Sequence, residues 1–235
     1  MSETFLVTGA NRGIGLAVTK ELLSQGDKVF GACRNPKEAS ALIALKKDYQ
    51  DSLEAVALDA DSDESVKKAA QEVPKKTKVL DVLINMAGIM PRPHDSKLED
   101  LDFKQCREAF ETNVLGPLRV TRFFLPLLRE SKRARIVNVT SGIGSISGTD
   151  NPHFYAYGAS KSALNKVTRI LALELKPDNI VAVALDPGWV KTDMGGPNAW
   201  LTPEESSSAI VKTVKNLKME QTSLFIHNDG KVLSW

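Results

Sequence analysis

The chain has 235 residues, of which 42% are hydrophobic and 26% are charged, and its formal net charge is +2. This composition is typical of an ordinary globular protein with a sizeable core, and the length allows one large or two small domains. The basic runs are short and lack interleaved aromatic residues, which disfavours nucleic-acid binding, and no apolar run reaches membrane-spanning length.

Short β-rich segments alternate with helical patterns along the whole chain. We predict strands at 4–8, 28–32, 53–58, 79–85, 135–140, 180–185 and 223–227, and helices at 13–24, 36–47, 62–73, 101–128, 157–175 and 203–217. This alternation is typical of βαβ units with right-handed crossovers. We therefore expect an α/β fold in which residues 1–235 form a single domain. Its core would be a Rossmann-type, doubly wound parallel sheet of about seven strands in the order 3-2-1-4-5-6-7, with helices on both faces.

A glycine-rich segment follows the first predicted strand and leads into the first helix: Thr8-Gly9-Ala10-Asn11-Arg12-Gly13-Ile14-Gly15. Glycines at such a junction permit a tight turn and let the backbone approach a pyrophosphate, while the helix N-terminus supplies N–H donors. The pattern is weak by itself. Its place between a first strand and a first helix favours a dinucleotide site.

A tyrosine and a lysine lie four residues apart in Tyr157-Gly158-Ala159-Ser160-Lys161, so a helix would place them on one face. A positive charge beside a phenol favours the phenolate, and we expect Lys161 to lower the pKa of Tyr157 by about 1 to 3 units. Tyr155 has Ala159 at the same offset, which selects Tyr157. This spacing also occurs by chance on many helices, so its meaning depends on the other motifs.

Further motifs occur in order at predicted strand ends and helices: Asn85-Met86-Ala87-Gly88, Asn113, Ser141 and Pro187-Gly188. With the glycine-rich segment and the Tyr157 and Lys161 pair, they resemble the short-chain dehydrogenase/reductase family over essentially the whole chain. Segments 141–146, 194–199, 201–205 and 229–235 further resemble the C-factor and sniffer-like carbonyl reductases.

The resemblance implies a nicotinamide dinucleotide. An acidic residue after the second strand would bind a ribose 2′-hydroxyl, but this chain has Cys33-Arg34-Asn35 there, and Arg12 points to the same region. Two guanidinium groups favour a 2′-phosphate, and hence NADP(H). Met86 departs from the usual second asparagine of its motif, which puts one supporting hydrogen bond in doubt. The implied cofactor-binding residues are Thr8, Gly9, Asn11, Arg12, Gly13, Ile14, Gly15, Arg34, Asp59, Ala60, Asn85, Ala87, Gly88, Tyr157, Lys161, Pro187, Gly188, Val190 and Thr192.

The implied catalytic residues are Asn113, Ser141, Tyr157 and Lys161. Ser141 would polarise a substrate carbonyl, with Ser145 as the alternative because sixteen positions separate Ser141 from the tyrosine. Tyr157 would donate the proton, and Lys161 would bind the nicotinamide ribose. Asn113 would hold a water relay to the lysine.

We therefore expect an NADPH-dependent reductase of small, largely apolar ketones or aldehydes. The apolar pocket would involve loop residues Met90, Ile143, Phe154, Trp189, Met194 and Trp200, and residues 193–200 would form a lid. Three alternatives stay open: reduction of an alkene, an epimerisation at the same site, and a regulatory role that requires only NADP binding.

Two cysteines and three scattered histidines show no disulfide framework and no metal-ligand spacing. An apolar segment begins by residue 4, which leaves no room for a secretion leader. We expect a cytoplasmic protein with a small-molecule substrate and neither a nucleic acid nor a membrane partner. Helices 101–128 and 157–175 are apolar on more than one face, and relatives often pair through them, so we expect a homodimer.

Overall fold

The computed structural model describes residues 2–92, 97–150 and 152–235. In this part of the chain, seven parallel strands form one sheet in the order β3-β2-β1-β4-β5-β6-β7, which confirms the predicted topology. The strands are β1 (Thr4–Thr8), β2 (Lys28–Cys33), β3 (Leu53–Ala57), β4 (Val82–Asn85), β5 (Arg135–Val139), β6 (Val181–Asp186) and β7 (Phe225–His227).

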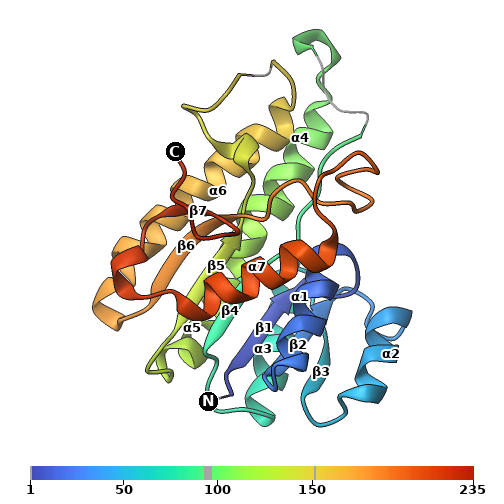
Figure 1. Cartoon of the computed structure of the whole chain (residues 1–235), viewed down its shortest axis with the longest axis vertical. Helices are drawn as coiled ribbons and strands as arrows, with labels where there is room; N and C mark the ends of the chain where they lie inside the picture. Colours follow the sequence, from blue (N-terminus) through green and yellow to red (C-terminus); the bar gives the residue numbers. More distant parts are fainter. Residues whose placement is uncertain (1, 93–96, 151) are drawn as a thin grey trace.

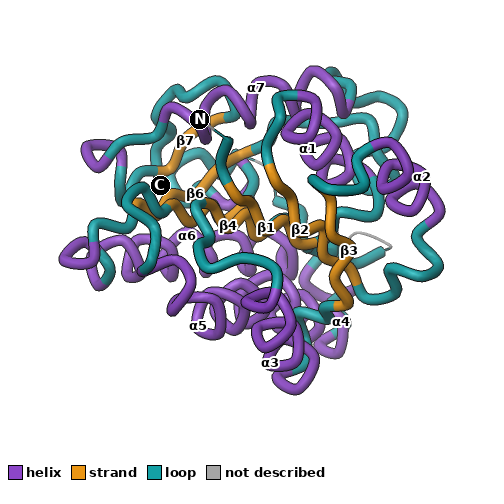
Figure 2. The backbone as a smooth tube through the Cα atoms, turned by 90° about the horizontal axis from the view of Figure 1, so that it is seen from below, coloured by secondary structure: helices purple, strands orange, loops and turns teal. Residues whose placement is uncertain are grey.

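Helices cover both faces of the sheet (Figure 2). On one face lie α1 (Gly13–Ser24), α2 (Ser40–Asp48) and α7 (Pro203–Asn216). On the other lie α3 (Asp63–Glu72), α4 (Phe103–Phe110), α5 (Gly116–Arg129) and α6 (Tyr155–Glu174). Short 3₁₀ turns occur at Val73–Lys75, Leu98–Asp100, Gly142–Gly144, Lys176–Asp178 and Met219–Gln221.

Each face of the sheet has its own hydrophobic core. Val18, Leu22 and Ile210 of α1 and α7 are fully buried in the first core, and Val120 and Phe124 of α5 are nearly or fully buried in the second. Full burial of one such side chain stabilises the fold by about 1.5 to 3 kcal/mol. The strands are therefore held between two apolar layers, which is the usual environment of a parallel sheet.

The predicted helix at 101–128 is not continuous. It is interrupted between α4 and α5 by a five-residue π-helical turn, Glu111–Leu115. The N–H of Gly116 bonds to the carbonyl of Glu111, five residues back. Pro117 follows and has no N–H for the carbonyl of Asn113, so the α-helical ladder cannot continue at that point.

The predicted helix at 36–47 also begins later, at Ser40. Residues 35–38 instead form a turn, in which the N–H of Glu38 bonds to the carbonyl of Asn35. The chain after β2 therefore passes over the end of the sheet before it becomes helical.

The strand order reverses between β1 and β4, which are neighbours in the sheet. In open α/β sheets, ligands bind beyond the carboxyl ends of the strands at such a switch point. Figure 1 shows the loops after β1, β4 and β6 at the end of the molecule away from the N-terminus. Among the described residues, no helix combines the length and the apolar character needed to cross a bilayer.

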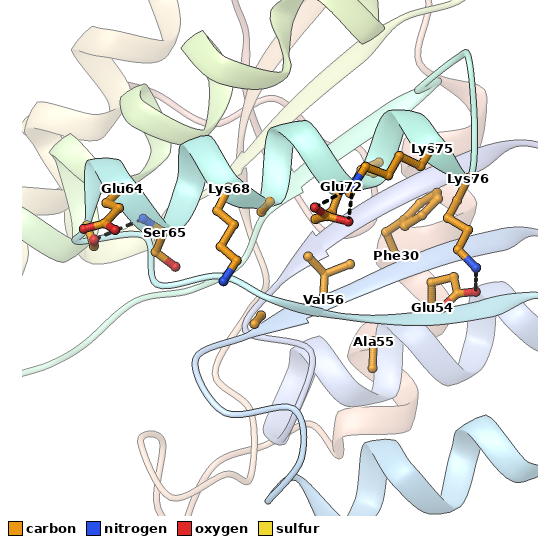
Figure 3. Close-up of a pocket in the computed structure, with 14 residues that line it drawn as sticks. Phe30, Glu54, Ala55, Val56, Glu64, Ser65, Lys68, Glu72, Lys75 and Lys76 are labelled. Atoms are coloured by element: carbon orange, nitrogen blue, oxygen red, sulfur yellow. Dashed lines mark hydrogen bonds and ion pairs between the residues drawn. The ribbon is translucent and has the colours of Figure 1, made fainter.

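A hollow of about 570 Å³ lies apart from this switch point, between the edge strand β3 and α3 (Figure 3). Phe30 and Val56 contribute apolar surface. Lys76 lies 3.6 Å from Glu54 of the edge strand, and such charged pairs discourage pairing with a further strand. The hollow contains none of the predicted site residues.

Candidate active site

The loops after β1 and β4 are joined by one side chain. Thr8 ends β1, and its Oγ1 accepts hydrogen bonds from the N–H groups of Met86 and Ala87, each at 3.0 Å. Two segments predicted to bind the cofactor therefore lie side by side. The backbone of Met86 is anchored here, so the absence of an asparagine side chain leaves this link intact.

The N-terminus of α1 is open to an anion. Gly9 has φ +67°, and a Cβ at Gly15 would lie 2.2 Å from the carbonyl oxygen of Gly9, so both positions favour glycine. Arg12 is the N-cap residue and makes no side-chain capping bond. The first N–H groups of the helix, which include those of Gly13 and Ile14, lack a capping side chain and suit a pyrophosphate.

Arginines lie where the adenosine end of a dinucleotide was predicted. Arg34 is exposed directly after β2. Arg12 is also exposed, and its Nη1 lies 3.2 Å from Oδ2 of Asp193. Asp59 follows β3, and its N–H donates to Ser65 Oγ at 2.9 Å. Both guanidinium groups are thus accessible to a phosphate, although Arg12 also contacts the segment after β6.

Asn85 belongs to a buried polar network. Its Nδ2 donates to Asn138 Oδ1 at 2.8 Å and to Thr121 Oγ1 at 3.3 Å, and Asn138 in turn donates to Thr168. These bonds lock the end of β4 to its neighbours. Asn85 therefore supports the loop that ends at Gly88, rather than projecting into it.

Asn113 occupies the π-helical turn and is fully buried. Its Oδ1 accepts from the N–H of Ile89 at 2.8 Å, while its Nδ2 donates to the carbonyl of Ile89 and to Ser160 Oγ, both at 2.9 Å. The side chain is thus committed to anchoring the loop after β4. Pro117 has no N–H to pair with the main-chain carbonyl of Asn113, so that carbonyl suits the predicted water relay better than the side chain does.

Ser141, rather than Ser145, contacts the tyrosine. Ser141 follows β5, its Oγ accepts from the N–H of Ile143 at 3.2 Å, and it hydrogen-bonds Tyr157. The Oγ of Ser145 donates to the carbonyl of Ser234 at 2.8 Å and accepts from Gly148 at 3.0 Å. Ser145 therefore braces its own loop.

Tyr157 and Lys161 lie one turn apart on α6, as the spacing predicts, and are only 8% and 4% exposed. The Nζ of Lys161 lies 5.6 Å from the centroid of the tyrosine ring and donates to the carbonyl of Val139 at 2.9 Å. A Cβ at Gly88 would lie 3.4 Å from this Nζ and 3.1 Å from Oδ1 of Asn113. The loop after β4 therefore passes directly over the lysine.

Burial dominates the protonation of this pair. It raises the pKa of Tyr157 to about 12, although the hydrogen bond with Ser141 lowers it, and the charge of Asp186 raises it further. Burial also lowers the pKa of Lys161 to about 8, against a raising effect of Asp186. The expected lowering of the tyrosine pKa by Lys161 is therefore absent from this structure, in which burial is the largest cause of the shift.

The segment after β6 crosses toward the glycine-rich loop. Its start is fixed, since the carbonyl of Pro187 accepts from Ser206 and Asn228 at 2.8 and 2.9 Å. Further along, Thr192 Cγ2 lies 3.4 Å from where a Cβ at Gly13 would stand. Val190 is buried and its carbonyl accepts from Thr192 Oγ1. The segment thus reaches across the loop after β1, as expected for a cover over a dinucleotide.

Arg92 was not foreseen. Its Nη2 donates to the carbonyls of Asp193 and Met194, at 2.5 and 2.8 Å, and so ties the loop after β4 to the predicted lid. Arginine in a loop at this edge is a weak signal, because a solvated surface charge has the same appearance in a sequence.

An apolar wall of exposed side chains lies on the loops after β5 and β6. The rings of Trp189 and Trp200 meet edge to face with centroids 5.4 Å apart, and Trp189 Nε1 donates to the carbonyl of Gly195 at 2.7 Å. Trp200 is 80% exposed and Ile143 is 43% exposed, although both are large and apolar. Exposed apolar side chains at the edge of the sheet where ligands bind are typical of a small-molecule pocket.

Comparison with known proteins places these features in context. The family model described as "short chain dehydrogenase" matches residues 3–200. The C-signal protein of Myxococcus xanthus is 39% identical over 156 residues, which cover 66% of this chain and 93% of that protein.

Two solved structures are similar over the whole chain. Carbonyl reductase Sniffer of D. melanogaster is 34% identical, with a TM-score of 0.95 and full coverage of both chains. The NADPH-bound carbonyl reductase from chicken fatty liver is also 34% identical, with a TM-score of 0.92 and coverage of 100% of this chain and 99% of that one.

Proposed function

The chain belongs to the short-chain dehydrogenase family, and from that premise we propose that it is an NADPH-dependent reductase of small, largely apolar ketones or aldehydes. One observation carries the proposal. Ser141, Tyr157 and Lys161 lie together at the carboxyl edge of the sheet, and the loop after β6 at the same edge carries the exposed Trp189 and Trp200. The similarity to two carbonyl reductases supports the same reaction class.

Several features support NADP(H) as the cofactor. The uncapped N-terminus of α1 offers N–H donors to the pyrophosphate, and Thr192 and Val190 would lie over the nicotinamide end. Arg12 at the start of α1 and Arg34 directly after β2 are both exposed, and no acidic residue directly follows β2, so a 2′-phosphate would gain charge-assisted hydrogen bonds. When bound, the reduced nicotinamide supplies a hydride to the carbonyl carbon.

The side chains of this chain supply the rest of the reaction. The hydroxyl of Ser141 donates a hydrogen bond to the substrate carbonyl oxygen, which becomes more negative as the reaction proceeds. Tyr157 transfers its phenolic proton to that oxygen, so the product is the alcohol. Tyr157, whose pKa is raised to about 12, is protonated at neutral pH and can therefore serve as the proton donor. Lys161, beside the ring, stabilises the phenolate that remains.

The apolar wall determines which carbonyl compounds are favoured. Trp189, Trp200 and Ile143 offer large apolar surfaces, and their partial exposure makes them accessible to a substrate. Burial of apolar area contributes about 25 cal/mol per Å². Aryl or alkyl ketones and aldehydes should therefore be reduced more efficiently than strongly charged carbonyl compounds.

Replacement of Tyr157 by phenylalanine tests the mechanism, because it removes one oxygen and retains the ring. A general acid typically contributes about 10²- to 10⁴-fold to the rate, so carbonyl reduction should fall by at least about 100-fold. NADPH affinity should change by less than about 1 kcal/mol. If Tyr157→Phe keeps near wild-type turnover on the best substrate, the proton comes from another group and this mechanism is wrong.

The alternatives make different predictions for the same enzyme preparation. A regulatory NADP-binding protein should bind NADPH and consume none with any member of a carbonyl panel, and an alkene reductase should convert enones to saturated ketones. We favour carbonyl reduction because Ser141 and Tyr157 are hydrogen-bonded to each other and so can act on one oxygen. Product analysis with an enone substrate distinguishes the two reductions.

A further inference from the structure

Lys161 is a buried cation that lacks a close counter-charge. It is 4% exposed, and its Nζ donates to the neutral carbonyl of Val139. In the described part of the chain, no carboxylate lies within ion-pair distance of this Nζ, 4.0 Å. A buried charge is costly unless other charges compensate it. The protonated state of Lys161 therefore depends on charges slightly farther away.

Asp186 provides a fixed negative charge on that side of the sheet. It ends β6, its side chain is 13% exposed, and its Oδ1 accepts from the N–H of Gly188 at 3.2 Å. A Cβ at Gly142 would lie 3.4 Å from Oδ2, so the carboxylate borders the turn that follows Ser141. The charge of Asp186 also raises the pKa of both Lys161 and Tyr157, which agrees with this position.

A second row of polar and charged groups lies on the outer side of Asp186. Asp186 is paired with His227 in the register of β6 and β7, and His227 Nε2 lies 4.0 Å from its Oδ2. The other ring nitrogen of His227 lies 3.1 Å from Asp229 Oδ1, and Asp229 in turn pairs with Lys231 at 3.0 Å. A protonated His227 would carry an N–H toward each carboxylate.

We propose that Asp186 is an electrostatic positioning residue for the Tyr157 and Lys161 pair, held in place by the N–H of Gly188. Its carboxylate favours the ammonium form of Lys161 and the neutral phenol of Tyr157, which are the forms needed for carbonyl reduction. Asp186 acts through these groups and does not contact the substrate. The inference rests on the proposed function for its role in catalysis.

The charged and titratable groups around Asp186 come from three elements. Tyr157 and Lys161 belong to α6, His227 belongs to β7, and Asp229 and Lys231 follow β7. Removal of the charge of Asp186 should therefore destabilise the protonated forms of both α6 residues. Carbonyl reduction should then be lost at a lower pH than in the wild type.

Asp186→Asn tests this inference, because the amide oxygen can still accept from Gly188 while the charge is lost. We expect the high-pH limb of kcat/KM for carbonyl reduction to move down by at least about 0.5 pH unit. Turnover well below that limb should stay within about twofold of the wild type. Asp178→Asn is the matched control, since Asp178 lies before the opposite end of β6 in an ion pair with Arg129, and its profile should not move.

Asp186→Ala separates charge from structure, because it also removes the bond to Gly188. It should shift the pH limb as Asp186→Asn does, and should in addition raise the KM for NADPH or lower the thermal midpoint. If Asp186→Asn turns over at the wild-type rate with a superimposable pH profile, the carboxylate acts only as a structural acceptor and the inference is overturned.

NADPH affinity gives a readout that does not require catalysis. Lys161 is proposed to bind the cofactor, so the pH at which NADPH affinity weakens, measured by cofactor fluorescence, should be lower in Asp186→Asn than in the wild type. A shifted binding midpoint without any carbonyl reduction by the wild type would refute the proposed function and retain the role of Asp186. If the wild type reduces carbonyl compounds but Asp186→Asn shifts neither the NADPH-binding midpoint nor the pH profile of the rate, the proposed function stands and the role of Asp186 is refuted.

Discussion

Replacement of Lys161 by methionine should stabilise the folded protein and abolish its activity. Methionine has a similar length and no charge, so the variant no longer buries an ammonium group. Burial lowers the pKa of Lys161 from its ordinary value of 10.5 to about 8. By linkage, this difference corresponds to about 3 kcal/mol by which the lysine destabilises the folded state at neutral pH.

The sign and the pH window follow from proton binding. Between about pH 8 and 10.5, the unfolded chain binds the lysine proton and the folded chain does not, so the stability of the wild type rises with pH across this range. Below about pH 8, Lys161 is protonated in both states, and its burial destabilises the folded protein by the full amount of about 3 kcal/mol. The methionine variant loses one hydrogen bond to Val139, which offsets about 1 kcal/mol. We therefore expect a net gain of about 2 kcal/mol at pH 7, which disappears above about pH 10.5.

Urea denaturation of both proteins at pH 7, 9 and 10.5 measures this difference, and NADPH-dependent carbonyl reduction measures the lost activity. Lys166→Met is the control, because Lys166 lies on the same helix and is exposed, so its substitution should change stability by no more than about 0.5 kcal/mol. A Lys161→Met protein that is less stable than the wild type at pH 7, or a gain that is the same at every pH, would refute the reasoning.

Three further predictions follow from the cofactor loop, the lid and the helical surface. Arg34→Asp should raise the ratio of kcat/KM for NADH to that for NADPH, because a carboxylate repels a 2′-phosphate; an unchanged ratio would remove Arg34 from the site. Gly195→Ala should lower the thermal midpoint and disturb the lid more than Gly196→Ala, since a Cβ at Gly195 would lie 2.1 Å from the carbonyl of Val190, whereas Gly196 faces open space and its φ of +77° strains only the alanine backbone. Comparison of melting curves and of KM for the carbonyl substrate checks this, and equal effects would contradict it. We expect a homodimer by light scattering, and Leu173→Glu on α6, where leucine is 63% exposed, should shift it to monomer if that helix forms the interface.

The sequence was sufficient to predict the fold because its signals are local and repeated. Each strand is a short, largely apolar run, each strand but the last is followed by a helical pattern, and the right-handed crossover rule then restricts the order of the strands. The predicted order and the family resemblance are both confirmed. The predicted β1 and α1 also match the observed bounds, Thr4–Thr8 and Gly13–Ser24.

The break in the predicted helix 101–128 shows where periodicity is insufficient. The signal was present in Pro117, whose missing N–H lies four residues after Asn113. Pro117, a proline inside a periodic pattern, therefore indicated both the break in the helix and the position of Asn113 four residues before it.

The sequence by itself determined which groups meet at the carboxyl edge, because the ends of parallel strands gather there and a spacing of four residues places Tyr157 beside Lys161 on α6. Only the tertiary structure decided the direction of the pKa shifts of Tyr157 and Lys161 and which charged groups lie behind them. Burial depends on every element packed around a side chain, so the sequence predicted a lowered tyrosine pKa where the fold raises it to about 12. The approach of His227 to Asp186 likewise depends on the register of β6 and β7, which pairs residues 41 positions apart in the sequence and has no local signal.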